Sequence, residues 1–292
     1  MFPASFDYLP VHSIDEALAA LRAHGADARI LAGGQSLIPA MRYRLARPTV
    51  LVDINPIAAL AYIREADGAL LVGAGARDYA IEVSPIVKDG YRLISDAAAV
   101  VADPIVRQSG TVVGSLCHSD PAGDWGVVAL ASRATVVVRG TAGNRAVPID
   151  EFLVDSFTTA VGEGELALEV RFPTPDERTS GSYQKIERKV GDFATASAGV
   201  SLTLAADGSI AVAGVAIGAA GPKALRVAEA ERILVGAQPS TELFRAAAAE
   251  AKNISDPIAD SRGDIEFKRE MAAVLVYRGL VATLKRLPGG SR

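Results

Sequence analysis

Two short segments rich in glycine and hydroxyl side chains are the part of the sequence best suited to holding a ligand. In the first, two consecutive glycines remove the Cβ atoms that would keep a ligand away from the backbone. Free backbone N–H groups, a serine hydroxyl and a helix predicted over residues 37–42 could then bind an anion such as a pyrophosphate. An ordinary strand-to-helix turn would explain the segment equally well. Its residues are Ala32, Gly33, Gly34, Gln35, Ser36 and Leu37.

The second segment follows Gly110 and repeats these features as a glycine-containing turn with two hydroxyls. Neither segment matches a GxGxxG dinucleotide fingerprint or a phosphate loop ending in Gly-Lys-Ser/Thr. Two such turns in one chain nevertheless favour a single bulky diphosphate ligand. The residues of this second segment are Thr111, Val112, Val113, Gly114 and Ser115.

Asp120 and Asp124 lie shortly beyond the second segment. A carboxylate there could accept hydrogen bonds from ribose or ribityl hydroxyls. The alternative interpretation is structural: Asp120-Pro121 forms a turn, and an aspartate caps the following helix.

The single cysteine, Cys117, excludes an internal disulfide and a four-cysteine metal site. We expect it to be a small apolar residue buried beside the second segment, with His118 as a neighbour.

The three histidines lack metal-ligand spacing. Arg42, Arg44 and Arg47 are best explained as solvated residues of a helix and its flank.

Alternating short strands and helices must position the first segment. Ser13 and Glu16 form a capping box that begins a helix ending near Gly25. The pattern predicts strands over 28–32 and 49–54, a hairpin over 62–65 and 69–72, and helices over 84–101 and 127–131. A further strand is predicted over 134–139.

Composition shifts after residues 172–175, where two prolines precede a polar stretch. We therefore predict domains at 1–175 and 176–292. The second begins with strands over 183–189, 198–205 and 209–217 and ends with helices over 227–235, 241–252 and 267–286. Strands followed by helices indicate an α+β domain.

Composition excludes several classes of protein. The net charge of −4 leaves no basic footprint for nucleic acid. No apolar run reaches the roughly 20 residues of a membrane span, and the N-terminus lacks a signal pattern. We expect a cytoplasmic globular protein.

The ordered motifs resemble the FAD-binding medium subunits of molybdenum hydroxylases of the carbon monoxide dehydrogenase and xanthine dehydrogenase type. The resemblance rests on both segments, on Asp53-Ile54-Asn55, on Asp120 to Asp124, and on the stretch from Tyr183 to Ala194. It covers nearly the whole chain. Two positions depart from the family pattern: Gln35 stands where histidine is frequent, and Val113 where glycine is frequent.

The resemblance implies an α+β fold. A FAD-binding domain of the p-cresol methylhydroxylase and vanillyl-alcohol oxidase type, made of two small α/β subdomains, would precede an α+β C-terminal domain with an antiparallel sheet. Both segments would hold the pyrophosphate and ribityl chain of FAD, and Asp124 would bind part of the cofactor. Lys185 would lie near the flavin, although Gln184 or Arg188 could take that place.

The resemblance also implies an electron-transfer function without catalytic side chains in this chain. A small subunit with [2Fe–2S] clusters would pass electrons to FAD, and FAD would deliver them to NAD, a quinone, oxygen or another carrier. A large molybdopterin subunit would oxidise the substrate, within a heterotrimer or a dimer of heterotrimers. The alternatives are a stand-alone FAD-dependent oxidoreductase with its own small substrate, and a scaffold that has lost FAD.

Overall fold

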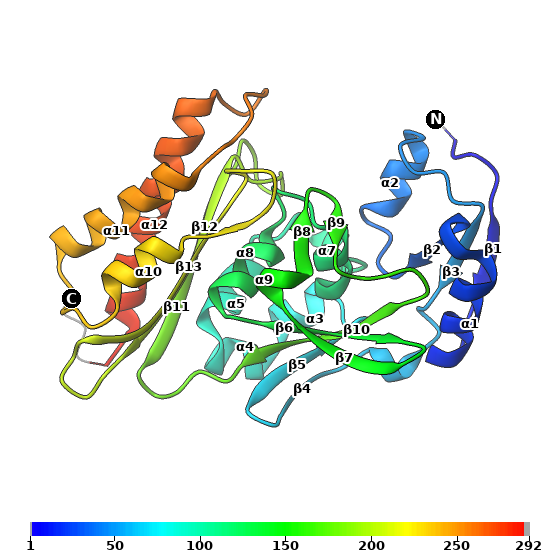
Figure 1. The fold of residues 1–292 in the computed structure, drawn as a ribbon, viewed down its shortest axis with the longest axis horizontal. Helices are drawn as coiled ribbons and strands as arrows, with labels where there is room; N and C mark the ends of the chain where they lie inside the picture. The colour runs from blue at the N-terminus through cyan, green and yellow to red at the C-terminus, as the bar shows by residue number, and fades with distance from the viewer. Residues whose placement is uncertain (1, 289–292) are drawn as a thin grey trace.

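The chain folds into three packed units in sequence order (Figure 1). The structure is a computed structural model that describes residues 2–288. The first unit is a parallel three-stranded sheet in the order β1-β3-β2. Its elements are β1 (Asp7–Pro10), α1 (Ile14–His24), a 3-10 turn (Gly25–Asp27), β2 (Ala28–Leu31), α2 (Leu37–Arg42) and β3 (Val50–Asp53).

Helix α1 shows how local sequence fixes this unit. The Ser13 hydroxyl accepts a hydrogen bond from the Glu16 N–H, and the Glu16 carboxylate accepts one from the His12 N–H. These bonds satisfy N–H groups that a helix start leaves free. The helix ends at Gly25, as predicted. Its buried side, which includes Leu18 and Leu21, belongs to the core that this unit shares with the rest of the domain.

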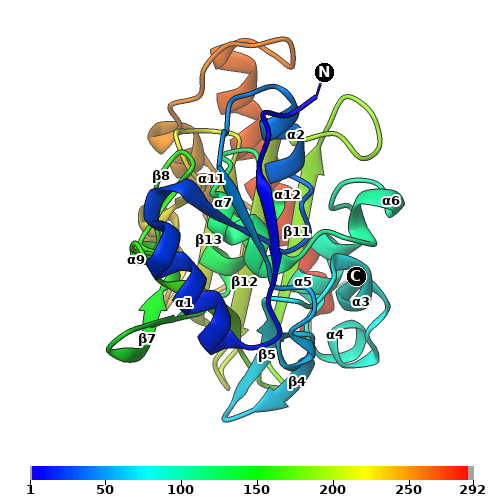
Figure 2. The same cartoon turned by 90° about the vertical axis from the view of Figure 1, so that its right-hand side faces the viewer.

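The second unit is built around an antiparallel sheet in the order β4-β5-β10-β6-β7, with helices packed beside it (Figure 2). The predicted hairpin of β4 and β5 is confirmed. The strands are β4 (Ile63–Ala66), β5 (Ala69–Gly73), β6 (Thr135–Gly140), β7 (Gly143–Pro148), β8 (Leu153–Asp155), β9 (Thr158–Thr159) and β10 (Leu166–Pro173). The helices are a 3-10 turn (Ala58–Leu60), α3 (Asp78–Val83), α4 (Pro85–Gly90), α5 (Arg92–Ala98), α6 (Pro104–Arg107), α7 (Val112–His118), α8 (Asp124–Ala131) and α9 (Ile149–Phe152).

The third unit is an antiparallel sheet in the order β11-β12-β13-β14 followed by three helices. The predicted succession of strands and then helices is confirmed. The elements are β11 (Thr179–Ile186), β12 (Ala196–Leu204), β13 (Ile210–Gly218), β14 (Leu225–Arg226), α10 (Ala228–Leu234), α11 (Thr241–Ile254) and α12 (Ile265–Arg286).

The C-terminal sheet is covered on both faces. Helices α10 to α12 lie over its outer face, and α5 and α8 of the second unit lie against its inner face (Figure 1). Val200 and Ile217 are fully buried in this sheet. Such strands are apolar on both faces, which explains their continuous hydrophobic runs. Within residues 2–288, no helix is both long and apolar enough to cross a membrane.

Candidate functional site

A cavity of about 910 Å³ runs between the first unit and the other two. It is lined by residues from β2 and α2, from α7, from the segment that leads into β10, and from the loop after β11. Eleven of the fourteen predicted site residues line it. They are Ala32, Gly33, Gly34, Gln35, Ser36, Leu37, Thr111, Val113, Gly114, Ser115 and Asp124.

The first segment presents free backbone donors to this cavity. Within the described residues, no backbone N–H group of residues 33–37 donates a hydrogen bond to a protein acceptor; the Gln35 side-chain amide donates to the Gly33 carbonyl at 3.4 Å. The Ser36 hydroxyl makes no capping bond at the start of α2, so it is also available. Gly34 has a φ of +71°, in the left-handed region that favours glycine. A run of unpaired donors around such a residue is suited to binding an anion.

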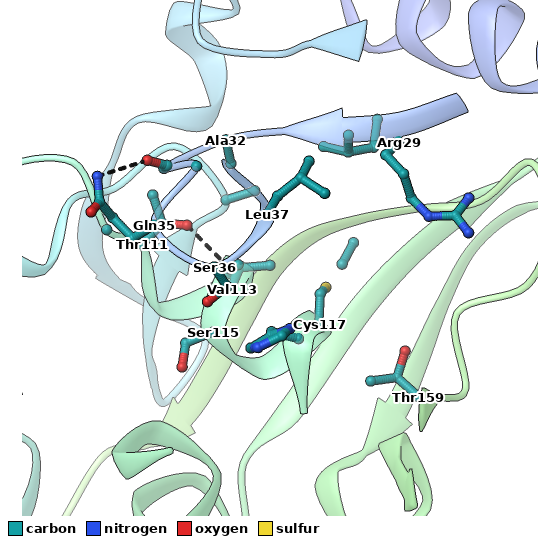
Figure 3. Close-up of a pocket in the computed structure, with 18 of the residues that line it drawn as sticks. Arg29, Ala32, Gln35, Ser36, Leu37, Thr111, Val113, Ser115, Cys117 and Thr159 are labelled. Atoms are coloured by element: carbon teal, nitrogen blue, oxygen red, sulfur yellow. Dashed lines mark hydrogen bonds between the residues drawn. The ribbon is translucent and has the colours of Figure 1, made fainter. Parts of the chain in front are cut away.

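The second segment differs from its predicted form. It is not a turn, because Thr111 is the N-cap of α7 and Val112 to Ser115 lie in the first turn of that helix. The Thr111 hydroxyl accepts a hydrogen bond from the Gly114 N–H at 3.1 Å. Figure 3 shows this bond beside Gln35 and Ser36, so the two segments face one another across one part of the cavity. The start of a helix supplies further N–H groups for an anion.

The glycines of the two segments stand where a Cβ atom would meet other protein atoms. A Cβ atom at Gly33 would overlap the carbonyl oxygen of Ser109 and would lie 2.9 Å from the Cα of Gly110. At Gly114 it would lie 2.6 Å from the Thr111 hydroxyl oxygen. We predicted these glycines for close approach of a ligand. The structure gives a further reason for each: Gly33 lets the first segment pack against Ser109 and Gly110, and Gly114 leaves room for the Thr111 hydroxyl within the second segment.

Asp124 lies at the first position of α8, where it lines the cavity and meets the C-terminal domain. It accepts hydrogen bonds from the Tyr183 hydroxyl at 2.5 Å and from the Lys185 ammonium, whose nitrogen is 3.2 Å from the nearer carboxylate oxygen. Burial raises the pKa of Asp124, and Lys185 and Tyr183 oppose that shift. Gly123, and not Asp124, is the helix cap.

Three predicted residues do not line the cavity. Val112 is buried in the hydrophobic core. The Asp120 carboxylate accepts a hydrogen bond from the Ala122 N–H in a turn, as the structural alternative had it. Lys185 reaches the cavity only through Asp124. Of the two other candidates near it, Gln184 donates to the Ser182 hydroxyl and Arg188 donates to Ser261.

Sequence reasoning missed a second buried carboxylate, Asp78, which lines the cavity at the start of α3. It accepts a hydrogen bond from the Trp125 indole at 3.0 Å. Burial raises the pKa of Asp78 to about 7; the bond from Trp125 opposes the shift, and the neighbouring Asp124 adds to it. A lone aspartate before an apolar stretch carries no sequence signal of this role.

Cys117 is not buried as predicted, because its side chain is exposed and faces the cavity (Figure 3). The cavity wall still surrounds the thiol closely, and this desolvation raises its pKa to about 12. Arg29 and Thr159 line the same part of the cavity, away from Gln35 and Ser115. Within the described residues there is no group of three or more side chains that could hold a metal ion.

Comparison with known protein families decides to which family the chain belongs. Residues 4–175 match the family described as the FAD binding domain in molybdopterin dehydrogenase. Residues 181–283 match the CO dehydrogenase flavoprotein C-terminal domain. The chain belongs to the FAD-binding medium subunits of molybdenum hydroxylases. The resemblance seen in its motifs is thereby confirmed, as are the predicted fold and its place among oxidoreductase subunits.

Full-length relatives share this organisation. The carbon monoxide dehydrogenase medium chain of Hydrogenophaga pseudoflava is 37% identical, with 98% of this chain and 99% of the relative covered. The 6-hydroxypseudooxynicotine dehydrogenase complex subunit alpha of Paenarthrobacter nicotinovorans is 36% identical, with 98% and 97% covered.

Solved structures of molybdenum hydroxylases agree closely. A chain of the H. pseudoflava carbon monoxide dehydrogenase superposes with a TM-score of 0.96 at 38% identity, with 99% of this chain and 100% of that chain covered. A chain of quinoline 2-oxidoreductase from Pseudomonas putida 86 gives 0.89 at 29% identity, with 97% and 98% covered.

The cavity fits the cofactor that this family binds. The unpaired N–H groups of the first segment and the start of α7 are donors of the kind that a diphosphate requires. The carboxylates of Asp78 and Asp124 are acceptors for hydroxyl or ring N–H groups. When bound, FAD supplies the redox chemistry, whereas the protein binds it, orients it and sets its electrostatic surroundings.

Proposed function

We propose that this chain binds one FAD in the cavity and relays electrons within a molybdenum hydroxylase complex. The observation that carries the proposal is that two segments almost 80 residues apart, each bearing free backbone donors, meet at one large cavity. In this proposal the first segment and the start of α7 hold the diphosphate. Asp124 accepts a hydrogen bond from the cofactor, with Lys185 behind it.

The route of electrons in this proposal is the one that the family implies, and the composition of the chain agrees with it. The chain has one cysteine, too few for an iron–sulfur cluster. We place [2Fe–2S] clusters in a small subunit that reduces the flavin. A large molybdopterin subunit oxidises the substrate. FAD passes the electrons to an external acceptor such as NAD, a quinone or oxygen, in a heterotrimer or a dimer of heterotrimers.

The extent of the match to known relatives supports a subunit of a complex over a stand-alone enzyme. The chain covers 97% and 99% of relatives named as a complex subunit and as a medium chain. Their names connect them with carbon monoxide and with an N-heterocyclic compound, so the substrate in this proposal is chosen by the large subunit. A cytoplasmic location stays a prediction.

We also propose the domain division at residues 175 and 176. The two family matches end at 175 and begin at 181. Strand β10 ends at Pro173 and β11 begins at Thr179, which leaves a short connection between two separate sheets.

The relay can be tested on the complex purified from its native host. FAD would be removed and then restored, with carbon monoxide, an N-heterocycle and an aldehyde as trial substrates. We expect the FAD-free complex to reduce its iron–sulfur clusters with the productive substrate and to lose electron transfer to the acceptor until FAD returns. The same substrates would be added to this chain after separation from its partners. If one of them reduced the bound FAD directly, the stand-alone oxidoreductase would be supported instead.

A further inference from the structure

A hydrogen-bonded path joins the two cavity segments on their outer side. The Asn55 side-chain amide donates to the carbonyl oxygen of Ala32 at 2.9 Å. The Arg77 guanidinium donates to the Asn55 side-chain oxygen at 2.6 Å and to the carbonyl oxygen of Ser109 at 2.6 Å. Ala32 begins the first segment, and Ser109 lies two residues before the second. The path therefore ties the start of one segment to the approach of the other.

Both bridging side chains are themselves fixed. The buried carboxylate of Asp53 accepts the backbone and side-chain N–H groups of Asn55, at 3.0 and 2.5 Å. Arg77 forms a backbone bridge with Thr111 and is the residue before α3. The next N–H, that of Asp78, donates to the Gly110 carbonyl at 2.8 Å. These bonds fix the backbone at Asn55 and at Arg77, so the link between their side chains has a defined geometry.

The link cannot act by touching the cofactor. Neither Asn55 nor Arg77 is among the residues that line the cavity. Their side chains reach the two segments only through the backbone carbonyls of Ala32 and Ser109. Gly33 packs directly against Ser109 and Gly110, so the position of one segment dictates where the other presents its free N–H groups.

We propose that Arg77 and Asn55 are positioning residues for FAD, which hold the two segments at the separation that lets both bind one diphosphate. This inference rests on the proposed FAD site. A protein without the link would spend only part of its time with the segments correctly spaced. The apparent affinity for FAD falls by that fraction, even if every contact with FAD is kept.

The test is a titration of the full chain, freed of flavin, with FAD, followed by quenching of flavin fluorescence. We expect Arg77→Met and Asn55→Ala each to weaken binding about tenfold to a hundredfold, the range for losing hydrogen bonds to a charged group. The double variant should bind about as weakly as the weaker single one, because both substitutions break the same link. Arg77→Lys should recover part of the affinity, since an ammonium cannot serve both acceptors as the guanidinium fork does.

Arg133→Met is the matched control. Arg133 also donates to a backbone carbonyl, that of Ala213, and to a side chain, that of Glu231, but it does not line the cavity. It should leave FAD affinity unchanged. Two outcomes would overturn the positioning role without touching the proposed FAD site. One is wild-type FAD affinity in both Arg77→Met and Asn55→Ala; the other is a double variant whose loss of affinity is the product of the two single losses. A wild-type chain that takes up no FAD would overturn the proposed site first. If Arg77→Met fails to fold, the exposed Asn55 still supplies a test.

Discussion

Lys185 of β11 extends from the C-terminal domain to within 3.2 Å of Asp124 at the start of α8. Its ammonium also lies 3.1 Å from the Glu187 carboxylate and donates to the Val100 carbonyl at 3.1 Å. The lysine side chain is only 3% exposed. One buried cation thus separates two carboxylates where the two domains meet beside the cavity.

Replacing Lys185 with methionine should destabilise the protein strongly. Removing one partner of a buried ion pair leaves an uncompensated charge and costs about 3–5 kcal/mol. The loss should be smaller near pH 5 than at pH 8, because burial raises the pKa of Asp124 and removal of the cation raises it further. Thermal melts of the flavin-free chain across this pH range measure both effects.

Adding Asp124→Asn to Lys185→Met should recover part of the lost stability at pH 8, since it removes the unpaired charge. A fall in stability that is equal at all pH values, with no recovery in the double variant, would show that Lys185 stabilises only by packing.

Asp78 should give the flavin-free protein a pH-dependent stability. Its pKa is raised by burial to about 7, from an ordinary value of 3.8. The folded state therefore holds a proton that the unfolded state releases, and stability contributed by this group falls as pH rises from about 4 to 7. Asp78→Asn should match the wild type near pH 4 and exceed it by up to about 4 kcal/mol above pH 7.

The difference between the two denaturation curves, measured pH by pH, isolates this group from Asp124 and the other carboxylates. Asparagine can still accept the bond from Trp125, so the variant keeps that contact. Parallel curves for the two proteins would contradict the assignment of a raised pKa to Asp78.

Gly33→Ala should weaken both stability and FAD binding. The added Cβ would press on the backbone of Ser109 and Gly110, which cannot move aside as a side-chain tip could. Overpacking of this kind costs about 1–3 kcal/mol. Gly90→Ala is the control, because a Cβ there meets nothing within 4 Å. Equal melting temperatures and equal FAD affinity in the two variants would contradict the contact between the segments.

The elements around the first segment could be predicted because local signals agree with the fold. The capping box at Ser13, the stop at Gly25 and the short apolar runs led to α1, β2 and β3 within a residue or two at most boundaries. The C-terminal helices and strands β12 and β13 followed from periodicity in the same way, whereas β11 begins four residues before its predicted start and β14 was not predicted. Strand β10 was not predicted, although it is the central strand of the second sheet.

Most of the residues predicted for the site line the cavity, but whether they bind the cofactor stays a prediction. Glycines and hydroxyls within a short stretch of sequence are enough to predict a binding segment. The roles of Asp78, Asn55 and Arg77 depend instead on contacts with residues 22 or more positions away in the sequence. Whether Thr111 begins a turn or a helix also depends on packing of α7. Exposure of Cys117 depends on a cavity formed by units far apart in the chain.

Cys117 offers a direct probe of where FAD lies. Its thiol is the only one in the chain and faces the cavity. Alkylation should be slow at pH 7 and accelerate as pH rises, because desolvation raises its pKa to about 12 and only the thiolate reacts. Saturating FAD should slow labelling further, as followed by mass spectrometry at pH 9.

The control for this labelling is Ala206→Cys in a Cys117→Ser background, which places the thiol on the exposed hairpin turn between β12 and β13. FAD should leave its labelling rate unchanged. Labelling of Cys117 at the same rate with and without FAD would place the cofactor elsewhere.

The flavin content of the complex isolated from its native host tests the central claim most directly. An absorption spectrum before and after denaturation, with the released flavin identified by chromatography, gives the cofactor and its ratio to this chain. We predict one FAD per copy of this chain, with iron–sulfur absorption that segregates with a smaller subunit. A complex without flavin, or with FAD bound only by another subunit, would contradict the assignment of the cavity.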